Sequence, residues 1–200
     1  MKKQVKNIAE EEQGRNGHFA RIEPDFFLRE AVLGDAAKIW QTISDNRNDL
    51  RTWLPFVDNL REVADEEKFL ELQLSLPYEE RNIVFVIGRG TELCGLIGFV
   101  TTDNLNHRTE IGYWLIPEYR GTGLMTRCVR HLCEWAVKER GMNRVQIRCA
   151  VGNFPSNAIP QRLNFVLEGI EREGELLASG KYTDLNVYSI LKSEIENWNK

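Results

Sequence analysis

The segment that decides the fold is EIGYWLIPEYRGTGLMTRCVRHLCEWAVKER, residues 110–140. It overlaps a run rich in β-branched and aromatic residues at 108–116, which predicts a strand that Pro117 closes. After a short loop with two glycines, apolar residues recur with helical spacing from 124 to 136, with charged residues between them. Gly141 supplies the helix stop. The segment therefore predicts a strand, a tight loop and one amphipathic helix.

The loop reads Arg120-Gly121-Thr122-Gly123, and it delivers the free N–H groups of a helix N-terminus beside a strand end. Such an arrangement binds phosphate, the glycines allow the backbone to approach the ligand, and Arg120 adds a positive charge. A Walker motif is excluded because no Lys followed by Ser or Thr completes the pattern. The dinucleotide fingerprint is excluded because its third glycine is missing. Taken alone, a Gly-Thr-Gly turn fits a plain tight turn as well as a phosphate site.

Length and composition narrow the class of protein. Two hundred residues with 42% hydrophobic content suit one domain with a substantial core. A net charge of −4 with both signs interspersed argues against direct nucleic-acid binding and suits a cationic acceptor. The four cysteines form no C-x-x-C pair, so neither a disulfide framework nor a metal site is expected. No apolar run is long enough for a membrane span or a signal peptide, which favours the cytoplasm.

The polar residues 1–20 are expected to form a mobile extension or a loosely paired added strand, ahead of a single domain at 21–200. Apolar alternation and turn residues predict the remaining elements. The expected strands are 26–32, 82–88, 93–101, 108–116, 144–151, 165–173 and 181–191, and the expected helices begin near Asp35 and span 65–76, 124–140 and 153–164.

The segment NDLRTWLPFVD, residues 48–58, reads as a compact loop or short helix with an apolar Trp-Leu-Pro-Phe cluster. Two interpretations stay open. The cluster either packs under the loop or forms a lid over an acceptor site.

Longer stretches resemble one known family. TEIGYWL, RGTGLMT, MNRVQIRCAVGN, SNAIPQRLNF and LEGIEREGELLASGKYTDLNVYSIL, with LRTWLPFVD upstream, are similar to the ribosomal-protein N-terminal acetyltransferase branch of the GCN5-related N-acetyltransferases. Met125 stands where the family often has Gly or Ala, a departure that is frequent in this branch. The resemblance implies an α+β (mixed α/β) acyl-CoA N-acyltransferase fold, with a mainly antiparallel sheet flanked by helices. The fourth and fifth strands of that sheet splay apart, and coenzyme A threads the gap.

The same resemblance implies acetyl-CoA as co-substrate and no metal. The pyrophosphate loop would be Arg120, Gly121, Thr122, Gly123, Leu124, Met125 and Thr126. Backbone N–H groups around Leu115 and Ile116 would hold the thioester carbonyl and the pantetheine amides. Asn153 would contact the pantetheine or phosphate region, and Ser156 would lie near the sulfur.

Acetyl transfer to an amine needs a base for the amine proton and an acid for the departing thiolate. Glu110 is the candidate base, directly or through a water, on the same strand face as Gly112. Its structural alternative is an ion pair or a solvent-facing position. Ser156 is the candidate acid, and its alternative is ordinary helix capping. Cys149 alternates with apolar residues and is expected to be packed, so no acetyl-enzyme is expected.

Three functions remain open at this stage. The first is acetylation of the N-terminal α-amine of a ribosomal or other protein by direct attack in a ternary complex. The second is acetylation of a small polyamine or aminoglycoside-like amine. The third is a coenzyme-A-binding module without catalysis. A homodimer is expected by resemblance alone. His107 and His131 are interpreted as surface or packing residues.

Overall fold

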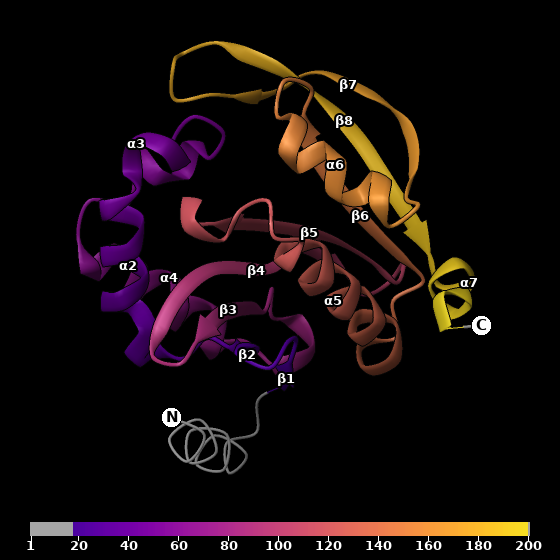
Figure 1. Cartoon of the computed structure of the whole chain (residues 1–200), viewed down its shortest axis with the longest axis horizontal. Helices are drawn as coiled ribbons and strands as arrows, with labels where there is room; N and C mark the ends of the chain where they lie inside the picture. The colour runs from indigo at the N-terminus through magenta and orange to yellow at the C-terminus, as the bar shows by residue number, and fades with distance from the viewer. Residues whose placement is uncertain (1–17, 200) are drawn as a thin grey trace.

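The computed structural model describes residues 18–199, and their fold is built on one eight-stranded sheet (Figure 1). Its order is β1-β2-β3-β4-β5-β6-β8-β7, and all neighbours are antiparallel except β5 and β6. The strands are β1 (Phe19–Arg21), β2 (Phe26–Glu30), β3 (Val84–Arg89), β4 (Glu92–Asp103), β5 (Arg108–Leu115), β6 (Arg144–Ala150), β7 (Val166–Leu176) and β8 (Tyr182–Leu191). The predicted mixed, mainly antiparallel sheet is confirmed.

Helices cover both faces of this sheet. They are α2 (Ala36–Asp45), α3 (Arg47–Leu50), α4 (Val63–Ser75), α5 (Leu124–Arg140), α6 (Phe154–Arg162) and α7 (Lys192–Ile195). Short 3-10 turns occupy Leu33–Asp35, Pro55–Asp58, Tyr78–Glu80, Pro117–Tyr119 and Glu196–Asn199. The central helix α5 starts and stops at the two predicted glycines, because Gly123 (φ 81°) and Gly141 (φ 66°) both adopt left-handed backbone that favours glycine.

Each face of the sheet packs against its own apolar cluster. The cluster under α5 includes Ile111 of β5 and Phe85 of β3, together with Cys128 and Leu132 of the helix itself. The opposite cluster joins α2 and α4 to the other face of the same strands and includes Leu70, Val86 and Trp114. Because strand side chains alternate between faces, Glu110, Gly112 and Trp114 lie on the α4 face.

The predicted splay is present between β5 and β6. These strands pair only through Arg108–Arg144, Thr109–Val145 and Glu110–Gln146 and then separate. Beyond Glu110, therefore, the edge of β5 that faces β6 carries no ladder hydrogen bonds. In this chain the two strands are the fifth and sixth, because β1 adds a strand before the expected first one.

Several boundaries differ from the sequence expectation. The expected strand 26–32 ends at Glu30, and Phe19 and Ala20, which were assigned to the extension, pair with β2. The rest of that extension, residues 1–17, lies outside the described residues. The expected strand 144–151 ends at Ala150, and Val151, just beyond it, is 37% exposed.

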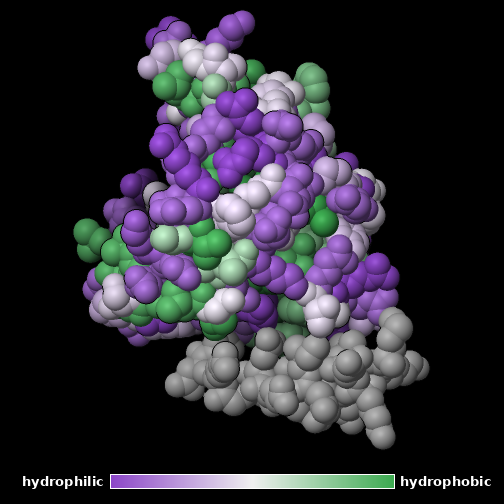
Figure 2. Space-filling model, turned by 90° about the vertical axis from the view of Figure 1, so that its left-hand side faces the viewer, coloured by the Kyte–Doolittle hydropathy of each residue, from purple (hydrophilic) through white to green (hydrophobic). Residues whose placement is uncertain are grey.

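Helix α4 begins two residues before the expected span of 65–76 and ends one residue before its end. It buries Leu70 and leaves three of its apolar side chains exposed, Phe69, Leu72 and Leu74. Figure 2 views the molecule from the side on which α2 and α3 lie in Figure 1. It shows apolar surface gathered at the lower left of that face. Helical spacing alone therefore did not predict which of these α4 side chains would be buried in the core.

Candidate functional site

A cavity of about 680 Å³ opens on the α4 face of the sheet and continues to the splayed part of β6. That volume falls in the range of small-molecule sites. Of the predicted site residues, Glu110, Asn153 and Ser156 line it. The apolar cluster of Trp53, Leu54, Pro55 and Phe56 lines it as well. The lid interpretation and the packing interpretation of that segment are thus both supported, since Leu50 and Val57 beside the cluster are buried.

Glu110 lies in β5 just where the strand leaves β6, and its carboxylate is held by two neighbours from β6. Arg148 Nε donates to both carboxylate oxygens, at 3.1 and 3.0 Å, and Gln146 Nε2 donates to one of them at 3.3 Å. The Glu110 side chain is 12% exposed. Each oxygen of a carboxylate has two lone pairs, so an amine or a water can still bind. The ion-pair alternative of the sequence analysis is therefore present, and it leaves the base role available.

Gly112 lies on the same strand face as Glu110, but the space beside it is filled. A side chain there would instead meet Val100 Cγ2 at 2.7 Å, so the glycine makes space for Val100.

Ser156 sits in the first turn of α6, opposite the buried end of β6. Its Oγ lies 3.2 Å from Cys149 Sγ and donates to the Tyr113 hydroxyl at 3.3 Å. The Ser156 hydroxyl does not cap the helix, because the side chain of Asn153 does so by accepting from the Ser156 N–H. The capping alternative for Ser156 thus does not describe the structure, and its hydroxyl instead bonds to Tyr113 in the cavity wall.

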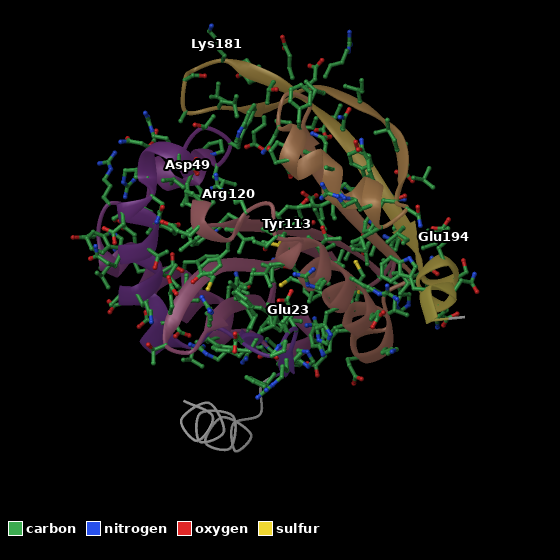
Figure 3. The ribbon with its side chains drawn as sticks, viewed as in Figure 1. Glu23, Asp49, Tyr113, Arg120, Lys181 and Glu194 are labelled. Carbon is green, nitrogen blue, oxygen red and sulfur yellow. The ribbon has the colours of Figure 1, made fainter. Side chains whose placement is uncertain are left out.

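Tyr113 was missed by the sequence analysis. Burial, and then the proximity of Cys149, raise the pKa of its phenol well above the ordinary value. The phenol therefore stays protonated at neutral pH. Its hydroxyl accepts from Ser156 Oγ and donates to the Ser156 backbone carbonyl at 3.2 Å, so it lies in contact with the oxygen that would need a proton after Ser156 has given one up. Its place in TEIGYWL, three residues after Glu110 and on the opposite strand face, was the available signal. Figure 3 shows Tyr113 near the centre of the molecule.

Cys149 is buried, as expected from its alternation. Burial raises the pKa of its thiol, which keeps it protonated and weakly nucleophilic. His107 and His131 do not line the cavity, and His131 stacks on His18 instead, with ring centroids 5.2 Å apart.

The predicted phosphate loop forms at the end of β5, outside the lining of this cavity. Gly121 (φ 74°) and Gly123 (φ 81°) both have left-handed backbone, and a Cβ on Gly121 would meet nothing within 4 Å. The first turn of α5 offers the N–H groups of Leu124, Met125 and Thr126, although the Leu124 N–H also contacts Thr122 Oγ1 at 3.3 Å. Leu124 and Met125 are buried, so only their backbone can reach a ligand. The open, amide-lined turn fits a pyrophosphate.

Arg120 does not extend freely from the loop, and Figure 3 shows its label close to that of Asp49. Its guanidinium donates to the Leu115 carbonyl at 2.9 and 2.7 Å and pairs with Asp49 of α3. A second guanidinium, that of Arg127, donates to the Thr122 carbonyl at 3.2 Å and pairs with Glu23. The sequence pattern of the helix gives Arg127 only a place among the charged residues between the apolar ones. The structure puts it across the loop.

The expectation for the end of β5 needs one correction. The Ile116 N–H donates to the Cys94 carbonyl at 2.9 Å and is therefore committed to the sheet. Antiparallel alternation turns the backbone of Leu115 and Tyr113 the other way, toward the gap left by β6. Leu115 thus stays a candidate for holding a pantetheine amide through its N–H, because its carbonyl already accepts from Arg120, and Tyr113 is the candidate in place of Ile116.

No group of three His, Cys, Asp or Glu side chains within residues 18–199 is arranged to hold a metal. No helix in that range is long and apolar enough to cross a membrane.

The chain is similar to known proteins of one family. A model of the acetyltransferase (GNAT) domain matches residues 25–166. The putative ribosomal N-acetyltransferase YdaF of Bacillus subtilis (strain 168) is 36% identical over 163 residues, which cover 81% of this chain and 88% of that protein. The ribosomal-protein-serine acetyltransferase of Escherichia coli (strain K12) is 29% identical, over 84% of this chain and 94% of that protein.

Among solved structures, RimL, a ribosomal L7/L12 alpha-N-protein acetyltransferase in complex with coenzyme A, superimposes with a TM-score of 0.82. It is 25% identical, and the match covers 87% of this chain and 98% of that chain.

Proposed function

The chain belongs to the acetyltransferase (GNAT) domain family and is an acetyl-CoA-dependent N-acetyltransferase, and from that premise we propose that its acceptor is the N-terminal α-amine of a ribosomal or other protein. The names of its relatives support a ribosomal acceptor. The observation that carries the proposal is the single cavity that joins Glu110 and Ser156 to the apolar wall of Trp53–Phe56. We further propose that residues 21–200 act as one catalytic domain.

The two substrates approach from different sides in this proposal. The loop at Gly121–Gly123 and the first turn of α5 hold the pyrophosphate, with Arg120 and Arg127 framing it. Backbone groups of Leu115 and Tyr113 and the side chain of Asn153 guide the pantetheine. The acceptor enters the cavity on the α4 face, so both substrates are bound together and the amine attacks the thioester directly.

Proton transfer is assigned to the two predicted residues. Glu110, oriented by Arg148, takes a proton from the attacking ammonium or from a water beside it. The amine nitrogen then bonds to the carbonyl carbon, and the carbon–sulfur bond breaks. Ser156 donates a proton to the departing sulfur and takes one back from the Tyr113 hydroxyl, which it contacts. The nitrogen gives up its second proton as the amide forms, and that proton returns through water to Tyr113. Glu110 releases the proton that it took to solvent, so every group ends in its starting state.

The acceptor class is tested with purified enzyme, labelled acetyl-CoA and a panel of amines at equal concentration. The panel holds peptides with a free N-terminus, the same peptides with a blocked N-terminus and an internal lysine, spermidine and an aminoglycoside. Fastest labelling of the free N-terminus is the expected result. Faster labelling of spermidine would overturn the protein-acceptor assignment and leave the enzyme class intact. Coenzyme binding without turnover of any amine would favour a binding module.

Two further assignments belong to this proposal. A homodimer is expected by resemblance, and the exposed apolar residues of the edge strand β7, Val166, Leu167 and Ile170, offer surface that a second copy would cover. A sedimentation experiment that finds only monomer at micromolar concentration would refute the homodimer. A ribosomal acceptor would also place the enzyme in the cytoplasm.

A further inference from the structure

Glu66 of α4 is a buried carboxylate that the chemistry above does not use. It is 3% exposed, and among residues 18–199 nothing hydrogen-bonds or ion-pairs with it. Burial is the cause that raises its pKa to about 7. A buried charged group without a partner destabilises a fold, so its presence in a cavity wall calls for a ligand.

Glu66 faces the same cavity as the catalytic candidates. Glu66, Phe69 and Gln73 all line it, and their spacing of three and four residues puts them on one helix face. Beside them lies Asn82, whose side-chain oxygen is buried and has no donor within the described part of the chain. This end of the cavity therefore holds two hydrogen-bond acceptors that lack a donor, set in an apolar wall.

The charges of the lining favour a cation. Four carboxylates line the cavity, from Asp65, Glu66, Glu110 and Glu175, against the single guanidinium of Arg148. That guanidinium is already engaged by Glu110 and Glu171. Asp65 accepts from the backbone N–H groups of Arg61 and Glu62, at 2.9 and 3.1 Å. Glu66 has no such donor, and a cation is the ligand that would favour its ionised form.

The α4 end of the cavity is removed from the reacting centre. The floor runs across three neighbouring strands through Val84, Gly98 and Gly112, which are register partners. Adjacent strands lie about 4.8 Å apart, so this floor alone spans roughly 10 Å between the strand under α4 and the strand that carries Glu110. The Ser156 cluster lies farther along, beyond the splay. A group bound at Glu66 is thus a different group from the amine being acetylated.

We propose that Glu66 is a specificity residue that binds a second, non-reacting cationic group of the acceptor, an ammonium or a guanidinium. For a protein acceptor this group is a basic side chain close to the N-terminus. The inference rests on the proposed function, because it concerns the acceptor cavity of the same site. It adds a substrate preference that charge on the whole chain does not reveal.

The test uses matched peptides with a free N-terminus that carry either arginine or its neutral isostere citrulline at position 2, 3 or 4. Neither side chain is an amine, so only the α-amine can be acetylated. Parent enzyme, Glu66→Gln and the control Glu67→Gln are compared, since Glu67 is exposed on the same helix. The ratio of kcat/KM for arginine over citrulline is measured at each position.

The parent is expected to favour arginine by about tenfold or more at one position, because a hydrogen bond to a charged group is worth that much. Glu66→Gln should reduce this ratio to near one through KM, with kcat little changed, and Glu67→Gln should keep it. An unchanged ratio in Glu66→Gln, or no preference in the parent, overturns the inference while acetylation continues. A loss of kcat for every peptide also overturns it, because Glu66 would then serve the reacting amine.

If none of the peptides is acetylated, the proposed function fails separately. Calorimetry of the arginine and citrulline peptides on the coenzyme-A complex of each variant then decides the inference alone. Preferential binding of arginine that Glu66→Gln abolishes supports it, and equal binding of both peptides refutes it.

Discussion

Replacing Glu66 with glutamine is expected to stabilise the fold, and to do so more strongly as the pH rises. The carboxyl of Glu66 has a pKa of about 7 in the folded protein against an ordinary value of 4.5, because burial disfavours its charge. Between these two values the folded protein binds more protons than the unfolded chain. Stability contributed by this residue is therefore greatest below pH 4.5 and is lost as the pH rises through 7.

The size of the effect follows from linkage. Each pH unit between the two pKa values is worth about 1.4 kcal/mol, so ionised Glu66 costs the fold about 3 kcal/mol at pH 8. Glutamine has nearly the same shape and cannot ionise. The stabilisation of Glu66→Gln over the parent should thus grow by about 2 to 3 kcal/mol between pH 5 and pH 8. In a domain of this size that corresponds to a rise in Tm of roughly 5–10 °C.

The assay is urea unfolding of the parent, Glu66→Gln and Glu67→Gln at pH 5, 6, 7 and 8, with equal m-values as the condition for comparison. Glu67 is exposed, so its variant controls for the loss of one negative charge on α4. Equal pH dependence of the two variants would refute the reasoning, because Glu66 would then be as well hydrated or paired as its neighbour.

Three other changes test the site. Gly123→Val should weaken acetyl-CoA binding in calorimetry, because position 123 has φ 81° and a side chain there would meet Arg127. The control Gly34→Val should bind the coenzyme like the parent, since position 34 has open space around it and no positive φ. Glu110→Gln should lower kcat about a hundredfold at saturating peptide while leaving coenzyme affinity nearly unchanged. Raising the pH should partly restore kcat, because more of the amine then arrives deprotonated. Full activity of this variant at pH 7 would refute the assignment of Glu110 as the base. Single turnover without acceptor should leave Cys149 unmodified, and an acetylated Cys149 seen by mass spectrometry would replace direct attack with a covalent route.

The sequence predicted the parts of the fold that depend on local pattern. The strand, loop and helix of residues 108–140 form as expected, since glycines in left-handed backbone and helical apolar spacing are encoded locally. The α4 face was less predictable. Phe69 and Leu72 match a helix core pattern, yet they stay exposed, because which face is covered depends on tertiary packing.

The sequence predicted individual site residues, but it did not predict which residues contact one another in the site. Glu110 and Ser156 were named from sequence, and both line the cavity. The ion pair of Glu110 with Arg148 joins residues 38 positions apart in the chain. The contact of Ser156 with Tyr113 spans 43 positions. No spacing rule connects such pairs, so the splayed register of β5 and β6 had to be seen first.

The most direct test of the central claim is to incubate the enzyme with acetyl-CoA and ribosomal proteins stripped of N-terminal acetyl groups, and to locate the product by tandem mass spectrometry. The account predicts one added acetyl group on the α-amine of one or a few ribosomal proteins, absent with Glu110→Gln at pH 7. Acetyl groups found only on lysine side chains, or no modification while spermidine in the same mixture is acetylated, would contradict it.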